Sequence, residues 1–258
     1  MKTKEKYVKH YDMVSDDVKF IAKSLIRLKV LTALYESPTD MKELTRVTDM
    51  SYSSISTALH YLELRGMVYR KSNRYYLVNS IKLQVKNLME LAIIINLLEE
   101  IFNIIQGHVI DRIPKESILE LHLLKNAELL ESDWDDPNRI LDVIESTLDE
   151  ANSARCILPV YYEGFNDKLN TLEENDKFVE IKVSKSLLNV YRENSKVKYI
   201  STFRGRNNFL LIITNEIMIL GLFNQENMFD KNRILISKSR DSLKWANNLF
   251  RYFKKINE

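Results

Sequence analysis

Apolar positions in the first quarter of the chain recur at helical spacing in three short runs. The first lies between residues 24 and 36, the second follows Asp40, and the third begins near Ser51. Asp40 is a residue type that caps helix N-termini, and Pro38 ends the first run. In the third run the apolar residues share one side, and the other side is a stripe of small polar residues: Ser53, Ser56, Thr57 and His60. The pattern predicts three helices.

After Gly66 the spacing changes from helical to strand-like. Gly66 is typical of a helix C-terminus. Residues 67–70 and 74–78 are rich in valine, tyrosine and leucine, and Lys71-Ser72-Asn73 separates them. This predicts a β-hairpin with a basic tip. Helix, helix-turn-helix and hairpin, in this order, form the layout of a winged helix.

From residue 80 to about residue 106, apolar residues repeat at intervals of seven, with a second set three positions further on. This predicts a long helix that pairs two copies of the chain through a coiled-coil seam. Additional isoleucines widen the apolar surface, so internal packing is the alternative. The predicted seam contains Ile81, Leu88, Leu91, Ile95, Leu98, Phe102 and Ile105.

The remaining half contains strand patterns and helices. Asp136-Pro137 predicts the start of one helix, and a second closes the chain from about Ser239. Strands are expected at 156–160, 178–183, 197–201, 209–214, 217–223 and 234–237. We therefore predict an α+β fold with three parts: a winged helix-turn-helix at 1–79, a connecting and dimerisation helix at 80–106, and a C-terminal α/β regulatory domain at 107–258.

Charge is distributed unevenly along the chain. Residues 1–80 contain 14 Lys and Arg against 9 Asp and Glu, whereas residues 81–153 contain 6 against 15. A basic front end next to an acidic middle favours a polyanion-binding domain. A single cysteine excludes an internal disulfide, and the apolar stretches are too short to span a bilayer. We expect a cytoplasmic protein without a membrane partner.

The small polar face of the third helix predicts contact with double-stranded DNA. Serine, threonine and histidine offer donors and acceptors without a long stem that would hold the helix away from the major groove. Cations of the hairpin would meet phosphates. The alternative is ordinary solvated surface. The predicted DNA-binding residues are Ser51, Tyr52, Ser53, Ser56, Thr57, His60, Arg70, Lys71, Asn73 and Arg74.

Several segments carry a family resemblance. Leu28-Lys29-Val30-Leu31, Lys42-Glu43-Leu44, residues 54–62 and Arg65-Gly66-Met67-Val68 resemble winged-helix regulators of the arsenic-repressor type. Residues 111–114, 126–130, 158–160, 220–223 and 243–253 resemble archaeal regulators that carry a methanogenesis-regulatory C-terminal domain. The resemblance implies a homodimeric, DNA-binding transcription regulator. The metal-binding cysteines of some arsenic-repressor relatives have no counterpart here.

The sequence favours binding over catalysis. All four histidines precede residue 123, the five glycines are too scattered for a phosphate loop, and Cys156 lies in an apolar strand. We expect neither an enzyme nor a cofactor. A small-molecule effector pocket is predicted at strand ends, with plain surface as the alternative, from Tyr161, Tyr162, Arg204 and Arg206. The competing function is a winged-helix and coiled-coil adaptor for protein assembly.

Overall fold

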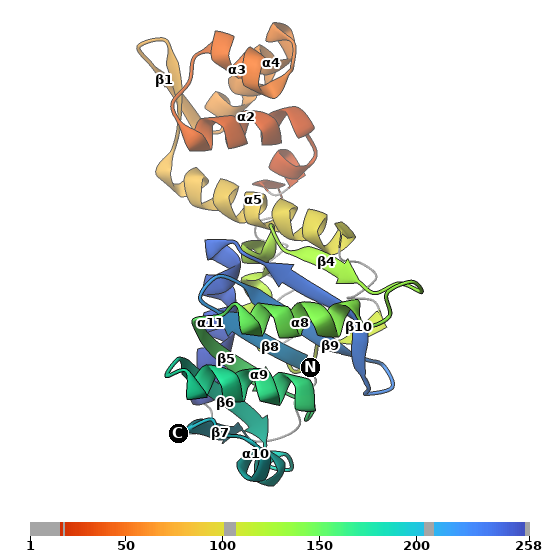
Figure 1. Cartoon of the computed structure of the whole chain (residues 1–258). Coiled ribbons are helices and arrows are strands. Elements are labelled where there is room, and N and C mark those ends of the chain that lie inside the picture. Colours follow the sequence, from red (N-terminus) through yellow and green to blue (C-terminus); the bar gives the residue numbers. More distant parts are fainter. Residues whose placement is uncertain (1–15, 18, 101–106, 204–208, 256–258) are drawn as a thin grey trace, which may run out of the picture. The chain divides into compact units, whose positions relative to one another are not determined.

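The computed structural model describes residues 16, 17, 19–100, 107–203 and 209–255. It combines helices with a sheet, so the predicted α+β class is confirmed (Figure 1). The chain divides into two compact units, Met1–Ala92 and Ile93–Glu258. The division falls inside helix α5 (Asn79–Glu100), which the sequence pattern treats as a separate part.

The first unit has the predicted winged-helix elements. They are α2 (Leu25–Glu36), α3 (Met41–Thr48), α4 (Tyr52–Leu64), β1 (Val68–Lys71) and β2 (Arg74–Leu77). Each of the three helices has a side-chain cap, because Ser24, Asp40 and Ser51 accept hydrogen bonds from backbone N–H groups in the first turn. These local signals account for the accuracy of the predicted helix starts.

A single apolar cluster holds the first unit together. It joins Leu31 of α2, Leu44 of α3, Leu59 of α4 and Leu77 of β2, all of them buried. The first turns of α5 also belong to it through Ile81 and Val85. Leu64 at the end of α4 is exposed.

The second unit is an eight-stranded mixed sheet in the order β4-β10-β9-β8-β5-β6-β7, with β3 paired to β9. The strands are β3 (His108–Val109), β4 (Glu128–Glu131), β5 (Ser153–Leu158), β6 (Phe178–Ser184), β7 (Tyr199–Phe203), β8 (Phe209–Thr214), β9 (Met218–Asn224) and β10 (Phe229–Ser237). Only the β5-β6 and β6-β7 pairs of the described strands are parallel.

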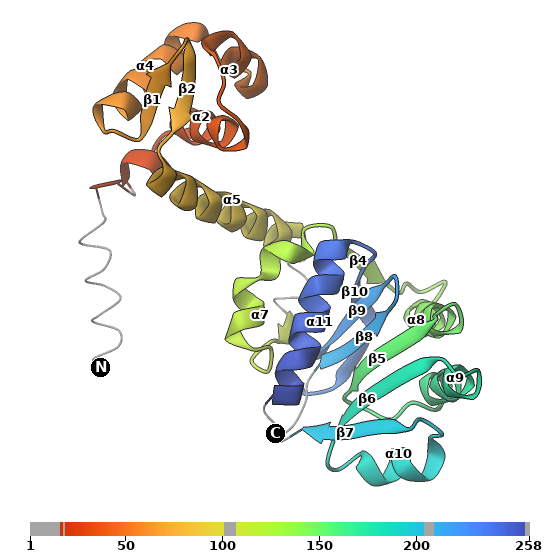
Figure 2. The same cartoon turned by 90° about the vertical axis from the view of Figure 1, so that its left-hand side faces the viewer.

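Helices cover both faces of this sheet (Figure 2). One face carries α8 (Arg139–Asp149), α9 (Glu163–Glu174) and α10 (Leu188–Asn194), and the other carries α11 (Arg240–Lys255). The short helices α7 (Lys115–Leu119) and η1 (Leu121–Leu124) contact α11. Two separate apolar clusters result, one on each face.

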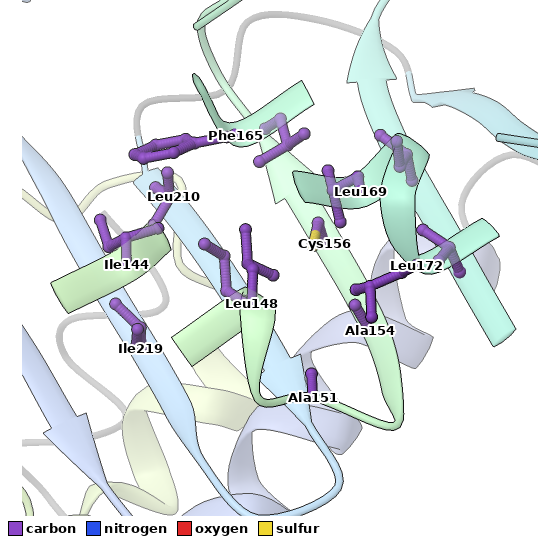
Figure 3. Packing of buried hydrophobic residues seen from close by; sticks show 14 of the residues in the cluster. Ile144, Leu148, Ala151, Ala154, Cys156, Phe165, Leu169, Leu172, Leu210 and Ile219 are labelled. Atoms are coloured by element: carbon purple, nitrogen blue, oxygen red, sulfur yellow. The ribbon is translucent and has the colours of Figure 1, made fainter. Parts of the chain in front are cut away.

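Cys156 lies in the cluster beneath α8 and α9, among Leu148, Leu169 and Leu210 (Figure 3). It is fully buried, and burial raises the pKa of its thiol. A neutral thiol in an apolar core is a poor nucleophile, so Cys156 acts as a small core residue.

Helix α8 begins later than the sequence pattern predicts. The N-cap is Asn138, without a side-chain hydrogen bond, and the helix starts at Arg139. The Asp133 carboxylate accepts hydrogen bonds from the backbone N–H groups of Asp135 and Asp136 at 3.0 and 2.8 Å. Because these hydrogen bonds hold residues 133–136 in a turn, the helix begins only after them.

Gly66 gives a stability prediction. Its φ of +65° lies in the left-handed region, and a Cβ there would meet nothing within 4 Å. Gly66→Ala should lower the free energy of unfolding by about 1 kcal/mol through backbone strain alone. Chemical denaturation measures the loss. Gly107→Ala is the control, because Gly107 also has open space but no positive φ; an equal loss in both would contradict the strain argument.

Candidate nucleic-acid interface

Helix α4 is fixed by its two neighbours. Asp49, in the left-handed conformation with φ of +53°, ends α3 and turns the chain toward α4. The Lys29 side chain donates to the carbonyl of Thr48 at 3.2 Å, which ties α2 to the start of this turn. Ile55, Ala58, Leu59 and Leu62 then bury one side of α4. The opposite side of the helix faces solvent.

The predicted polar stripe is present, but its members differ in their hydrogen bonding. Ser53, Ser56, Thr57 and His60 are all exposed. The Thr57 hydroxyl donates to the Ser53 carbonyl at 2.9 Å, within the helix. In the part of the chain that the structure describes, the side chains of Ser56 and His60 make no hydrogen bond. These two groups remain available for an outside partner.

Ser51, which is also among the predicted DNA-binding residues, caps α4. Its hydroxyl oxygen accepts from the backbone N–H of Ser54 at 3.3 Å and lies 2.8 Å from the Ser54 hydroxyl and 3.1 Å from that of Ser53. Ser51 therefore holds the N-terminus of α4 in place. Tyr52, the first helical residue, is exposed beside it.

The wing, residues 68–77, is a hairpin with a two-residue turn. Ser72 and Asn73 have φ of +48° and +65°, as a tight hairpin turn of the type I′ class requires. Tyr69 is opposite Tyr76, and Lys71 is opposite Arg74. Because opposite residues share a face, and so do residues two apart, these four side chains lie on one face. We call it the outer wing face.

Arg70 lies on the other face of the wing. It is opposite Tyr75, which packs into the core of the unit, and its guanidinium is 5.6 Å from the centre of the Tyr75 ring. Its side chain also donates to Oδ1 of Asn73 at 2.5 Å. The wing residues predicted to bind DNA are thus divided: Arg70 and Asn73 hold each other, whereas Lys71 and Arg74 have no ion-pair partner among the described residues.

The predicted seam of α5 is also divided. Ile81 is only 8% exposed in the core of the first unit, and Leu88 packs partly buried against the same core. Leu91 and Ile95 are 52% and 48% exposed, and Leu98 is half-buried. Leu83, which the seven-residue repeat does not include, is 68% exposed. Phe102 and Ile105 lie outside the described residues.

Two residues of the predicted effector pocket can be placed. Tyr161 and Tyr162 are half-buried at the end of β5, against Tyr191 and Phe165 at ring-centre distances of 5.2 and 4.5 Å. Burial, and then the charges of nearby carboxylates, raise the pKa of the Tyr161 hydroxyl. Arg204 and Arg206 lie outside the described residues.

The described residues contain no cluster of three or more His, Cys, Asp or Glu side chains placed to bind a metal ion. None of the helices in the described ranges is long and apolar enough to cross a membrane.

Two family models match separate parts of the chain. Residues 15–90 match the HVO_A0261 N-terminal domain, and residues 137–256 match the middle domain of the methanogenesis regulatory protein FilR1. These matches confirm the methanogenesis-regulatory resemblance. The FilR1 protein of Methanothrix harundinacea (strain 6Ac) is 25% identical over an alignment of 257 residues that covers 94% of this chain and 57% of FilR1. The chain thus spans little more than half the length of this relative.

Solved structures show weaker likeness. An archaeal chromatin protein, TrmBL2, is 14% identical with a TM-score of 0.38, covering 95% of this chain and 97% of its own. A predicted DNA-binding transcriptional regulator from E. coli is 24% identical with a TM-score of 0.29, covering 34% and 97%. A putative O-methyltransferase from Nostoc punctiforme is 14% identical with a TM-score of 0.27, covering 78% and 64%. These scores are too low to support a functional argument.

Proposed function

We propose that the chain is a transcription regulator that binds double-stranded DNA as a homodimer and acts by binding rather than by catalysis. The observation that carries the proposal is the exposed polar face of α4, whose Ser56 and His60 side chains make no hydrogen bond within the described chain. Side chains of this kind read base edges in the major groove. The match to the FilR1 middle domain, which belongs to a methanogenesis regulatory protein, supports a regulatory role.

The exposed apolar side chains of α5 support the dimer. Leu83, Leu91 and Ile95 are each about half exposed or more, and Leu98 is half-buried. A second copy that covers these residues would remove apolar surface from water, at about 25 cal/mol per Å². Two winged helices joined in this way would occupy successive turns of the major groove, about 34 Å apart.

The second unit is the proposed regulatory part. A small molecule or a protein partner that binds one dimer geometry more tightly than another would change the separation of the two α4 helices and hence the affinity for DNA. Tyr161 and Tyr162, at the carboxyl end of β5, remain the residues proposed to contact an effector.

Selection of bound fragments from genomic DNA by the purified chain tests the proposal. A DNA-binding regulator should enrich fragments with a paired half-site, and its affinity should fall steeply as salt rises. The competing adaptor function predicts no enrichment and an apolar interface that salt does not weaken. Absence of any enriched sequence at low salt would contradict sequence-specific binding.

The wing gives the first functional prediction. Replacing Lys71 and Arg74 together by alanine should weaken binding to all DNA sequences by similar factors, because both cations are free and face solvent. If each cation meets one phosphate in both copies of the dimer, four contacts are lost, and the slope of log affinity against log salt should become shallower by about four. Fluorescence anisotropy at several salt concentrations measures both effects.

Lys238→Ala with Arg240→Ala is the matched control. It removes the same two residue types from an exposed segment of the second unit, where they lie two positions apart instead of three. Its salt slope should remain that of the unaltered chain. If the wing variant and this control bind alike, the wing does not contact phosphates.

A further inference from the structure

We propose that the outer wing face, Tyr69, Lys71, Arg74 and Tyr76, binds single-stranded nucleic acid. A base would stack on the exposed side of the tyrosine pair, and the adjoining phosphates would meet the two cations. This goes beyond the proposed function, in which α4 reads duplex DNA. It assigns the wing a second ligand class, which would share Lys71 and Arg74 with duplex DNA and use the tyrosine pair in addition.

The tyrosine pair supplies a stacking surface. The rings of Tyr69 and Tyr76 are 5.2 Å apart between centres and only 13° from parallel, and Tyr69 is 48% exposed. Tyr69 is the more exposed of the two rings, because Tyr76 is half-buried, so we place the stacked base on Tyr69. Stacking of a base on an aromatic side chain tolerates any sequence, because every base has a π-face. In a duplex the base faces are covered by neighbouring pairs, so such a surface selects unpaired strands.

The two cations supply the electrostatic part. Lys71 follows Tyr69 by two residues and Arg74 precedes Tyr76 by two, so each cation lies about 7 Å along the strand from a tyrosine on the same face. Neither has an ion-pair partner among the described residues, whereas Arg70 on the opposite face is held by Asn73. Aromatic rings beside free cations are the combination that proteins use to hold single strands.

The test compares two labelled probes on the whole chain: an oligothymidylate of about ten nucleotides and an abasic strand of the same length, which has the same phosphates but no bases. Fluorescence anisotropy at low salt gives both affinities. The unaltered chain should bind the oligothymidylate about tenfold more tightly. Tyr69→Leu should abolish this preference, and Tyr69→Phe should retain it. Lys71→Ala with Arg74→Ala should weaken both probes by similar factors.

Equal affinity of the unaltered chain for the two probes would overturn the proposal, and this comparison does not depend on the folding of any variant. A preference that survives in both Tyr69→Leu and Tyr76→Leu would overturn it as well. Tyr199→Leu, which removes an exposed tyrosine from β7 in the second unit, is the control and should keep the preference. Duplex selection tests α4 separately: if it fails while the base preference remains, the proposed function fails and this inference stands.

Discussion

Replacing Ile95 by aspartate should convert a dimer of this chain into a folded monomer. Ile95 lies on α5 and is 48% exposed in the single chain, so a carboxylate there stays in water and the fold of the monomer is preserved. In the proposed dimer each copy would bury an unpaired charge at the interface, which costs several kcal/mol. Sedimentation should show half the mass, with little change in the melting temperature of the diluted protein.

Asn96→Asp is the matched control for this variant. Asn96 is the next residue of α5, is also exposed, and points away from the side that Leu91 and Ile95 share. The change adds the same charge, so the dimer should persist. A dimer that survives Ile95→Asp, or one that Asn96→Asp disrupts equally, would remove the α5 surface from the proposal.

Helices of the first unit could be predicted because their signals are local. Ser24, Asp40 and Ser51 each accept a backbone hydrogen bond within three residues of the chain. The apolar spacing that follows each cap then determines which side of the helix is buried. The caps and the apolar spacing can both be read from the sequence, and the predicted starts of these three helices agree with the structure to within a residue or two.

Strands that depend on distant partners were harder to predict. Strand β3 has two residues and exists through its pairing with β9, and β4 (Glu128–Glu131) is a short edge strand with a charged residue at each end. Neither has an alternating pattern long enough to recognise. The start of α8 was misplaced for a different, local reason: the Asp133 carboxylate accepts hydrogen bonds from the backbone N–H groups of Asp135 and Asp136, which holds the segment before the helix in a turn.

At the candidate site, composition pointed to α4, the wing and α5 but did not predict the local contacts of each side chain. Ser51 is among the predicted DNA-binding residues, yet its hydroxyl caps α4. Arg70 is one of the wing cations, yet cross-strand pairing places it opposite Tyr75. Ile81 obeys the seven-residue repeat, yet it packs in its own unit. A repeat shows that a helix has an apolar side and leaves open which surface covers it.

The exposed polar face of α4 should read bases. A double variant, Ser56→Ala with His60→Ala, should lose at least about tenfold in affinity for a selected DNA site while affinity for a scrambled site changes little, because each direct base contact contributes about 1 to 3 kcal/mol. Neither side chain makes a hydrogen bond within the described chain, and alanine favours helix. The loss should therefore come from missing DNA contacts rather than from unfolding.

Paired titrations against the selected and scrambled sites measure the ratio of specific to nonspecific affinity, and thermal melting checks the fold. Ser146→Ala is the matched control, since Ser146 is an exposed helical serine on α8 in the second unit. It should leave the ratio unchanged. If the double variant melts normally and keeps the full ratio, α4 does not read bases, and sequence preference must arise from the wing or from the shape of the DNA.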